Sequence, residues 1–202
     1  MVDLGAGTGK LTRTLAALGH EVVAVEPLEE MLAQLRANVP GVEALSGSAE
    51  QIPLADESVD AVVVAQAFHW FDQPAALVEI ARVLRPGGVI GLIWNARDDA
   101  EPWVARLSEL IGSEAEWDHE TPEPLAASTQ FGEVERQLFR HVQRLGRATL
   151  VDLIASRSYA ATMAPAEREQ LLASVGRLYD EAAAGREIEL PYRTYAFRAG
   201  RL

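Results

Sequence analysis

The chain has 202 residues, of which 30 are acidic and 18 basic, so its formal net charge is -12, and it contains no cysteine. This length suffices for one domain with a sizeable core. The lack of cysteine excludes disulfides, thiolate metal sites and a cysteine nucleophile, and the negative charge argues against a nucleic-acid partner. The longest apolar run, residues 61–65, is too short to span a bilayer. We therefore expect a cytoplasmic protein with no metal site, no nucleic-acid partner and no membrane partner.

A short apolar strand, residues 2–4, opens the chain and leads into the turn Gly5-Ala6-Gly7-Thr8-Gly9. A helix is predicted over residues 10–18, with Gly19 as its C-terminal cap. Such a turn between a strand and a helix is expected to have unpaired N–H groups that point outward. Glycine would let a ligand approach the main chain. The turn is therefore predicted to bind part of a nucleotide-like molecule.

Three ligand classes compete for this turn. A phosphate-binding P-loop requires glycine where Leu4 stands and Ser or Thr where Leu11 stands. A dinucleotide fingerprint requires a third glycine where Lys10 stands. What remains is an acid followed by G-x-G-x-G, and Asp3 suits the cation S-adenosylmethionine (SAM), whereas it would repel a pyrophosphate. A turn that merely closes a strand–helix unit, without any ligand, stays as the structural alternative.

A second apolar strand, residues 21–26, ends in Glu26, which stands 17 residues after Gly9. At about this spacing an acidic side chain binds both hydroxyls of a ribose. SAM and NAD share that ribose, so Glu26 supports an adenosine ligand without choosing between them. The alternative is a solvated acid at the end of a strand.

The remaining elements alternate between helix and strand up to residue 94. We expect helix 28–38, strand 42–45, strand 59–65, helix 74–84, residues 85–88 as the end of that helix, and strand 89–94. Beyond residue 99 we expect a helix and an irregular loop over 100–130, an extended segment 134–145, helices 149–158 and 165–184, and a last strand 188–197. The alternation predicts a parallel sheet with helices on both faces.

Several motifs together resemble the class I SAM-dependent methyltransferase superfamily, in the type 11-like group. They are Gly5-x-Gly7-x-Gly9, Glu26, Gly47-Ser48-Ala49-Glu50 and residues 82–88, in matching order and spacing. Residues 65–71 and 93–95 resemble a narrower branch that includes trans-aconitate methyltransferase-like enzymes for small molecules. The resemblance implies a Rossmann-like α/β fold with a seven-stranded, mostly parallel sheet, helices on both faces and a C-terminal antiparallel hairpin. It implies one domain over residues 1–202, with a cofactor-binding half 1–99 and a half 100–202 that completes the sheet and covers the substrate.

The resemblance also implies which residues bind SAM. The amino-acid end would be held by Asp3, Gly5, Ala6, Gly7, Thr8 and Gly9, the ribose by Glu26, the adenine by Pro27, Met31, Ser48, Ala49 and Glu50, and the methionyl part by Gln66 and Ala67. Most relatives have Asp where this chain has Ser48. A hydroxyl accepts a hydrogen bond more weakly than a carboxylate, so weaker adenine binding is expected.

The function implied is methyl transfer from SAM to a small molecule, possible acceptors being a carboxylate or another oxygen or nitrogen nucleophile. Transfer is an in-line displacement, in which positioning does most of the work. His69 is a candidate base, or else a pocket wall together with Trp70, and Arg97 is a candidate anchor for an acceptor carboxylate or else a surface residue. An NAD(P)-binding oxidoreductase and a SAM-binding homologue without catalysis remain as alternatives.

Relatives usually carry helices ahead of the first motif, and this chain starts inside the first strand. The fold is therefore expected to lack the usual N-terminal helices. If that short form is complete, we expect a cofactor site open on one side, lower SAM affinity and an activity in doubt.

Overall fold

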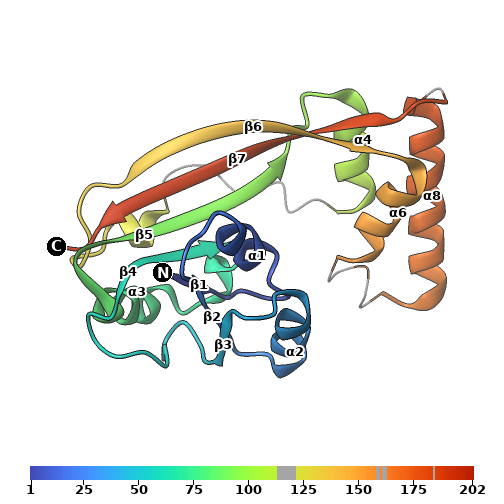
Figure 1. The fold of residues 1–202 in the computed structure, drawn as a ribbon. Helices are drawn as coiled ribbons and strands as arrows, with labels where there is room; N and C mark the ends of the chain where they lie inside the picture. Colours follow the sequence, from blue (N-terminus) through green and yellow to red (C-terminus); the bar gives the residue numbers. More distant parts are fainter. Residues whose placement is uncertain (113–121, 158–159, 161–162, 184) are drawn as a thin grey trace. The chain divides into compact units, whose positions relative to one another are not determined.

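The computed structural model describes residues 1–112, 122–157, 160, 163–183 and 185–202, and its strands form one seven-stranded sheet (Figure 1). The strands are β1 (Val2–Leu4), β2 (Val23–Glu26), β3 (Glu43–Ser46), β4 (Val59–Ala65), β5 (Leu84–Arg97), β6 (Glu135–Leu145) and β7 (Ile188–Gly200). Their order in the sheet is β3-β2-β1-β4-β5-β7-β6. The first five pair in parallel, and the last three form the antiparallel end. The predicted sheet is thus confirmed.

Helices connect the strands and surround the sheet. They are α1 (Lys10–Ala17), α2 (Glu29–Asn38), α3 (Gln73–Val83), α4 (Pro102–Leu110), α5 (Glu123–Ala126), α6 (Arg147–Ala155) and α8 (Pro165–Ala183), with a 3-10 turn η1 (Phe68–Trp70). These bounds agree with the predicted helices within a few residues, and the predicted ends at residues 158 and 184 lie outside the described residues. No helix in the described part of the chain is both long and apolar enough to cross a membrane.

The chain divides into two compact units. Unit 1 comprises Met1–Trp94, Glu120–Leu138 and Tyr195–Leu202, and unit 2 comprises Asn95–His119 and Phe139–Thr194. Unit 1 therefore takes in two segments from the C-terminal half of the chain. One domain with a division near residue 99 stays a prediction.

Strand β1 lies in the middle of unit 1 and determines where a ligand can bind. Val2 lies opposite Val23 of β2 and Val62 of β4, and both pairings are parallel. The strand is buried on both faces, as its apolar sequence predicts. The chain leaves β3 on one side of β1 and returns as β4 on the other side. The carboxyl end of β1 is therefore the topological switch point, where open α/β sheets bind ligands.

Strand β5 is longer than predicted. Leu84 already pairs with Val59, and after an irregularity the ladder resumes with Val89 opposite Ala61. Residues 85–88 therefore lie within the strand and not between a helix and a strand, which corrects the expected start at residue 89. Gly88 makes this possible, because a Cβ there would come within 2.9 Å of the Arg85 carbonyl oxygen.

Unit 2 has an apolar core of its own. The helices contribute residues at helical spacing, such as Leu171, Val175 and Leu178 on one face of α8. The fully buried members of this core are Val104, Leu107, Leu150, Val175 and Leu190. Each helix of the unit therefore buries one face against the others and against β7.

Three aromatic rings from β5, β7 and η1 pack together within unit 1. Phe197 of β7 packs edge-on against Trp94 of β5, with ring centroids 5.7 Å apart. Trp94 in turn packs edge-on against Phe68 at 6.3 Å. Phe197 and Phe68 are almost fully buried. This stack ties β5, β7 and η1 together.

We predict that Phe197→Ala lowers the free energy of unfolding by about 3–5 kcal/mol, because it leaves a cavity beside Trp94. Denaturant titration measures the change. Phe139→Ala, at a ring that is 48% exposed, is the matched control and should cost less than about 1 kcal/mol. Equal losses for the two variants would contradict this packing.

Candidate functional site

The opening turn binds its own N–H groups internally. Gly5 and Ala6 both donate to the Val25 carbonyl, at 2.9 and 3.1 Å, and Gly9 donates to the Ala6 carbonyl at 3.0 Å. The expectation of outward, unpaired amides is therefore wrong for these three residues. The reason is the parallel pairing of β1 with β2, which brings the Val25 carbonyl beneath the turn.

Glu26, at the end of β2, binds the same turn through its side chain. One carboxylate oxygen accepts the Gly7 N–H at 2.9 Å, and the other accepts the Leu28 N–H at 3.1 Å. The residue is only 5% exposed. Each carboxylate oxygen can accept more than one hydrogen bond, so both oxygens keep the capacity to bind a ligand hydroxyl.

Asp3 places a second carboxylate under the turn. It is 1% exposed, and the Thr12 hydroxyl donates to it at 2.6 Å. The Thr12 N–H is a further donor, so this carboxylate occupies the N-terminal turn of α1, where the helix dipole favours an anion. Sequence reasoning missed Thr12, because its burial against Asp3 becomes visible only in the fold.

The two carboxylates influence one another. Burial raises the pKa of Asp3 from 3.8 to about 6, the Thr12 hydrogen bonds oppose that rise, and the negative charge of Glu26 adds to it. A positive ligand charge nearby would offset the cost of burying the Asp3 charge and its repulsion by Glu26. A phosphate would add to both. The turn therefore has the electrostatics of a cation site.

The three glycines of the turn have different reasons to be glycine. Each has a positive φ, of 70° at Gly5, 56° at Gly7 and 84° at Gly9. A Cβ at Gly5 would lie 2.7 Å from the Ala67 Cβ, and a Cβ at Gly9 would lie 2.9 Å from the Leu35 Cγ. These two positions are needed for packing within the protein.

Gly7 differs because it faces open space. The nearest atom to a Cβ at this position is the Met31 sulfur, at 4.0 Å. The Asn38 side chain, at the end of α2, donates to the Thr8 carbonyl at 3.0 Å and holds the turn beside that helix. Gly7 is therefore the position where a ligand can approach the backbone, and Met31 lies next to it. Asn38 was not foreseen from the sequence.

The end of β4 forms the opposite side of the switch point. Gln66 has φ 57°, a left-handed conformation that is uncommon outside glycine, and its N–H donates to the Ile93 carbonyl at 3.0 Å. Strained residues of this kind gather at functional sites. Ala67 follows directly and lies against Gly5. The structure thus brings Ala67 against the glycine turn, and the contact of Gln66 and Ala67 with the methionyl part of SAM stays a prediction.

His69 and Trp70 lie on η1, which Phe68 anchors in the core of unit 1. The ring centroids of His69 and Trp70 are 4.9 Å apart, and Trp70 is 75% exposed. An exposed aromatic pair beside the end of β4 can line a pocket. Arg97 lies in unit 2.

The loop with Ser48, Ala49 and Glu50 follows β3. Ser48 and Pro27 line one open cavity of about 640 Å³. Glu79 and Arg82 also line it. Ala49 is buried. Glu50 accepts the N–H of Asp72 at 2.9 Å and so ties this loop to the start of α3.

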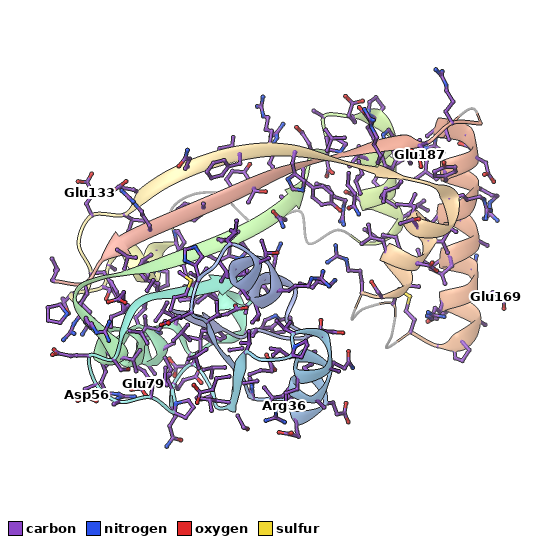
Figure 2. All side chains as sticks on the ribbon, in the orientation of Figure 1. Arg36, Asp56, Glu79, Glu133, Glu169 and Glu187 are labelled. Carbon is purple, nitrogen blue, oxygen red and sulfur yellow. The ribbon has the colours of Figure 1, made fainter. Side chains whose placement is uncertain are left out.

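Arg82 of α3 fixes the rest of that loop. It donates to the Ile52 carbonyl at 3.0 Å and to the Leu54 carbonyl at 2.9 Å, and it forms ion pairs of 2.6 Å with Asp56 and Glu79. Figure 2 shows Asp56 and Glu79 close together in unit 1. This network keeps the segment after Ser48 in place.

The site and the sheet together define a class of protein. An acid-backed glycine turn at the switch point of a parallel sheet with an antiparallel end is the arrangement of class I SAM-dependent methyltransferases. Residues 2–92 match the family described as "Methyltransferase domain". An "Uncharacterized methyltransferase" of Mycobacterium tuberculosis is 47% identical over 98% of this chain and 82% of its own length. The chain belongs to the class I SAM-dependent methyltransferase family.

Solved structures are similar over nearly the whole chain. A "Putative Type II Methyltransferase" from Anaeromyxobacter dehalogenans is 28% identical, with a TM-score of 0.71, and the match covers 99% of this chain and 88% of that one. Phosphoethanolamine N-methyltransferase 2 of Haemonchus contortus, solved with phosphomonomethylethanolamine and S-adenosylhomocysteine, shares the fold at 19% identity and a TM-score of 0.56, over 100% of this chain and 48% of that one. Membership of this family excludes the alternative of an NAD(P)-binding oxidoreductase. The trans-aconitate-like specificity stays a prediction.

We predict that Gly9→Ala lowers the free energy of unfolding by about 3 kcal/mol. Alanine is strained at the positive φ of this position, and its Cβ would also overlap with Leu35 of α2. Gly7→Ala should cost only about 1 kcal/mol, since space surrounds that position. Urea titration of both variants measures the difference. Equal losses would show that the two glycines do not differ in packing.

We predict that the wild type loses stability relative to the Asp3→Asn variant as pH rises from 4 to 7. The folded-state pKa of Asp3 is raised, so its contribution favours folding below pH 3.8 and is lost as pH rises through about 6. The stability difference between variant and wild type should therefore grow by about 3 kcal/mol over this range. Unfolding curves at several pH values measure it, and a constant difference would contradict the raised pKa.

Proposed function

We propose that Glu26 binds the ribose hydroxyls of SAM and that the turn at Gly7 receives the amino-acid end of the cofactor. The observation that carries this proposal is the buried Glu26 carboxylate, which accepts the Gly7 and Leu28 N–H groups at the switch point of the sheet. Glu26 is the last residue of β2, at the carboxyl edge where open α/β sheets bind their ligands. The same hydrogen bonds keep the carboxylate in one orientation, so little ordering is needed on binding.

The charges around the turn support SAM over a phosphorylated nucleotide. Asp3 and Glu26 are buried acids, and the amides of Gly5, Ala6 and Gly9 are already bound within the protein. A pyrophosphate would find few free donors and two negative charges. The ammonium and sulfonium of SAM would be attracted by the same charges.

The remaining contacts follow from the elements around the turn. Pro27 and Met31 would pack near the adenine, Ser48, Ala49 and Glu50 would border its edge, and Gln66 and Ala67 would lie along the methionyl chain. Two observations support this arrangement: Met31 lies beside Gly7, and Ala67 lies against Gly5. The Ser48 hydroxyl is a weaker acceptor than a carboxylate, so the adenine amine would be held less firmly.

SAM supplies a methyl group that is already activated by the sulfonium, so the protein needs no nucleophile of its own. The residues of the chain orient the cofactor and the acceptor in line and keep water out. His69 would accept a proton from an acceptor that carries one, and Trp70, whose ring centroid lies 4.9 Å from that of His69, would form the wall beside it. A carboxylate acceptor is already ionised and needs no base.

The acceptor is proposed to be a small molecule in the cytoplasm and not a nucleic acid. The net charge of -12 would repel a phosphate backbone. The aromatic pair of His69 and Trp70 is also too small a surface to bind a polymer by itself.

Isothermal titration calorimetry with SAM and with NADH tests the proposed cofactor site. We expect SAM to bind and NADH not to bind, and Glu26→Gln to weaken SAM at least about tenfold, because the amide loses charge and one acceptor. Glu30→Gln, at an exposed acid on α2, is the matched control and should leave the affinity within about twofold. Unchanged SAM binding in the folded Glu26→Gln variant would refute the assignment.

A further inference from the structure

In unit 2 the end of β5 pairs with β7 and places Arg97 across from Tyr192. The Asp98 N–H donates to the Pro191 carbonyl at 2.9 Å, which fixes the antiparallel register at this end of the sheet. Figure 1 shows β5 and β7 side by side along this stretch. Directly opposed residues of antiparallel strands have their side chains on the same face. Arg97 and Tyr192 therefore share one face.

Other polar groups gather on that face. The Thr194 hydroxyl donates to the Asn95 side-chain oxygen at 2.6 Å, and it lies 3.4 Å from the His141 Nδ1. The His141 ring stacks on the Tyr192 ring, with centroids 4.9 Å apart and planes 5° from parallel. The tyrosine ring is thus held in one orientation.

A second guanidinium reaches Tyr192 from the segment after α6. The Arg157 guanidinium lies close enough to the Tyr192 hydroxyl to influence the pKa of that phenol. Burial raises the pKa of Tyr192, and the positive charges of Arg157 and Arg97 oppose that rise. Both cations therefore lie close to one phenol group.

Neither cation has a carboxylate partner among the residues that the structure describes. The ion pairs found there involve other arginines, and the Nε of Arg97 is buried without a hydrogen bond. Asp98 is the nearest acid along the chain, and it pairs with Arg193 at 2.6 Å. Because strand residues alternate, Arg193 lies on the opposite face from Tyr192.

A buried guanidinium N–H without an acceptor is costly, so such a group indicates an acceptor that binds there. Arginine has a planar set of donors that matches the two oxygens of a carboxylate. We propose that Arg97, Arg157 and the Tyr192 hydroxyl form a binding site for a carboxylate of a small organic acid. This site lies wholly in unit 2, and carboxylate binding there does not depend on the proposed cofactor site of unit 1.

Calorimetric titration of the full chain with succinate tests the site, because a dicarboxylate can contact both guanidiniums. Succinate is expected to bind, and its neutral diamide is not. Arg97→Gln and Arg157→Gln should each weaken succinate at least about tenfold. Arg106→Gln removes an exposed ion pair with Glu181 in the same unit and should leave binding within about twofold. Arg157 is exposed, so its variant remains a valid test if Arg97→Gln fails to fold.

Two outcomes would overturn the proposal. One is no succinate binding, or binding that both arginine variants leave unchanged. The other is inorganic phosphate binding more tightly than succinate with the same dependence on Arg97 and Arg157, which would make this a phosphate site. SAM titrated in parallel separates the two proposals. SAM binding without succinate binding refutes only the carboxylate site, and the reverse result refutes only the cofactor site.

Discussion

Two buried carboxylates beneath the opening turn are the constraint on which the cofactor site depends. Asp3 accepts the hydroxyl of Thr12 in the first turn of α1, and Glu26 accepts the Gly7 N–H. The protein's own acids therefore take the place that an anionic ligand has in other glycine-rich turns. Hydrogen bonds within the protein hold the shape of the turn, and the field of the two carboxylates attracts a cation. The family of methyltransferases uses a cofactor with that charge.

The sequence predicted the fold well because its signals were local. The bounds of β4 came directly from an apolar run, and Gly19 ended α1 as a helix-capping glycine does. What could not be predicted depends on neighbouring strands. The Val25 carbonyl takes two turn amides only because β2 lies beside β1, and β5 begins early because Leu84 finds Val59 across the sheet.

The residues of the candidate site also fall into two groups: those that the sequence indicated and those that only the fold shows. Motif spacing indicated Glu26, and the family resemblance indicated Gln66 and Ala67. These residues end β2 and follow β4, the strands on either side of β1. Thr12 and Asn38 support the turn from helices and belong to no short motif, so their roles depend on tertiary contacts. The carboxylate site proposed in unit 2 could be predicted from the sequence even less well. Its parts come from β5, β7 and the segment after α6, and only the strand register shows that Arg97 and Tyr192 share one face.

The most direct test of this account is a crystal structure of the chain with S-adenosylhomocysteine. The account predicts ribose hydroxyls on the Glu26 carboxylate, the amino-acid end of the ligand beside Gly7, and turn amides still bound to Val25. A ligand bound elsewhere, or a turn that turns its amides outward toward an anion while Glu26 points away, would contradict it.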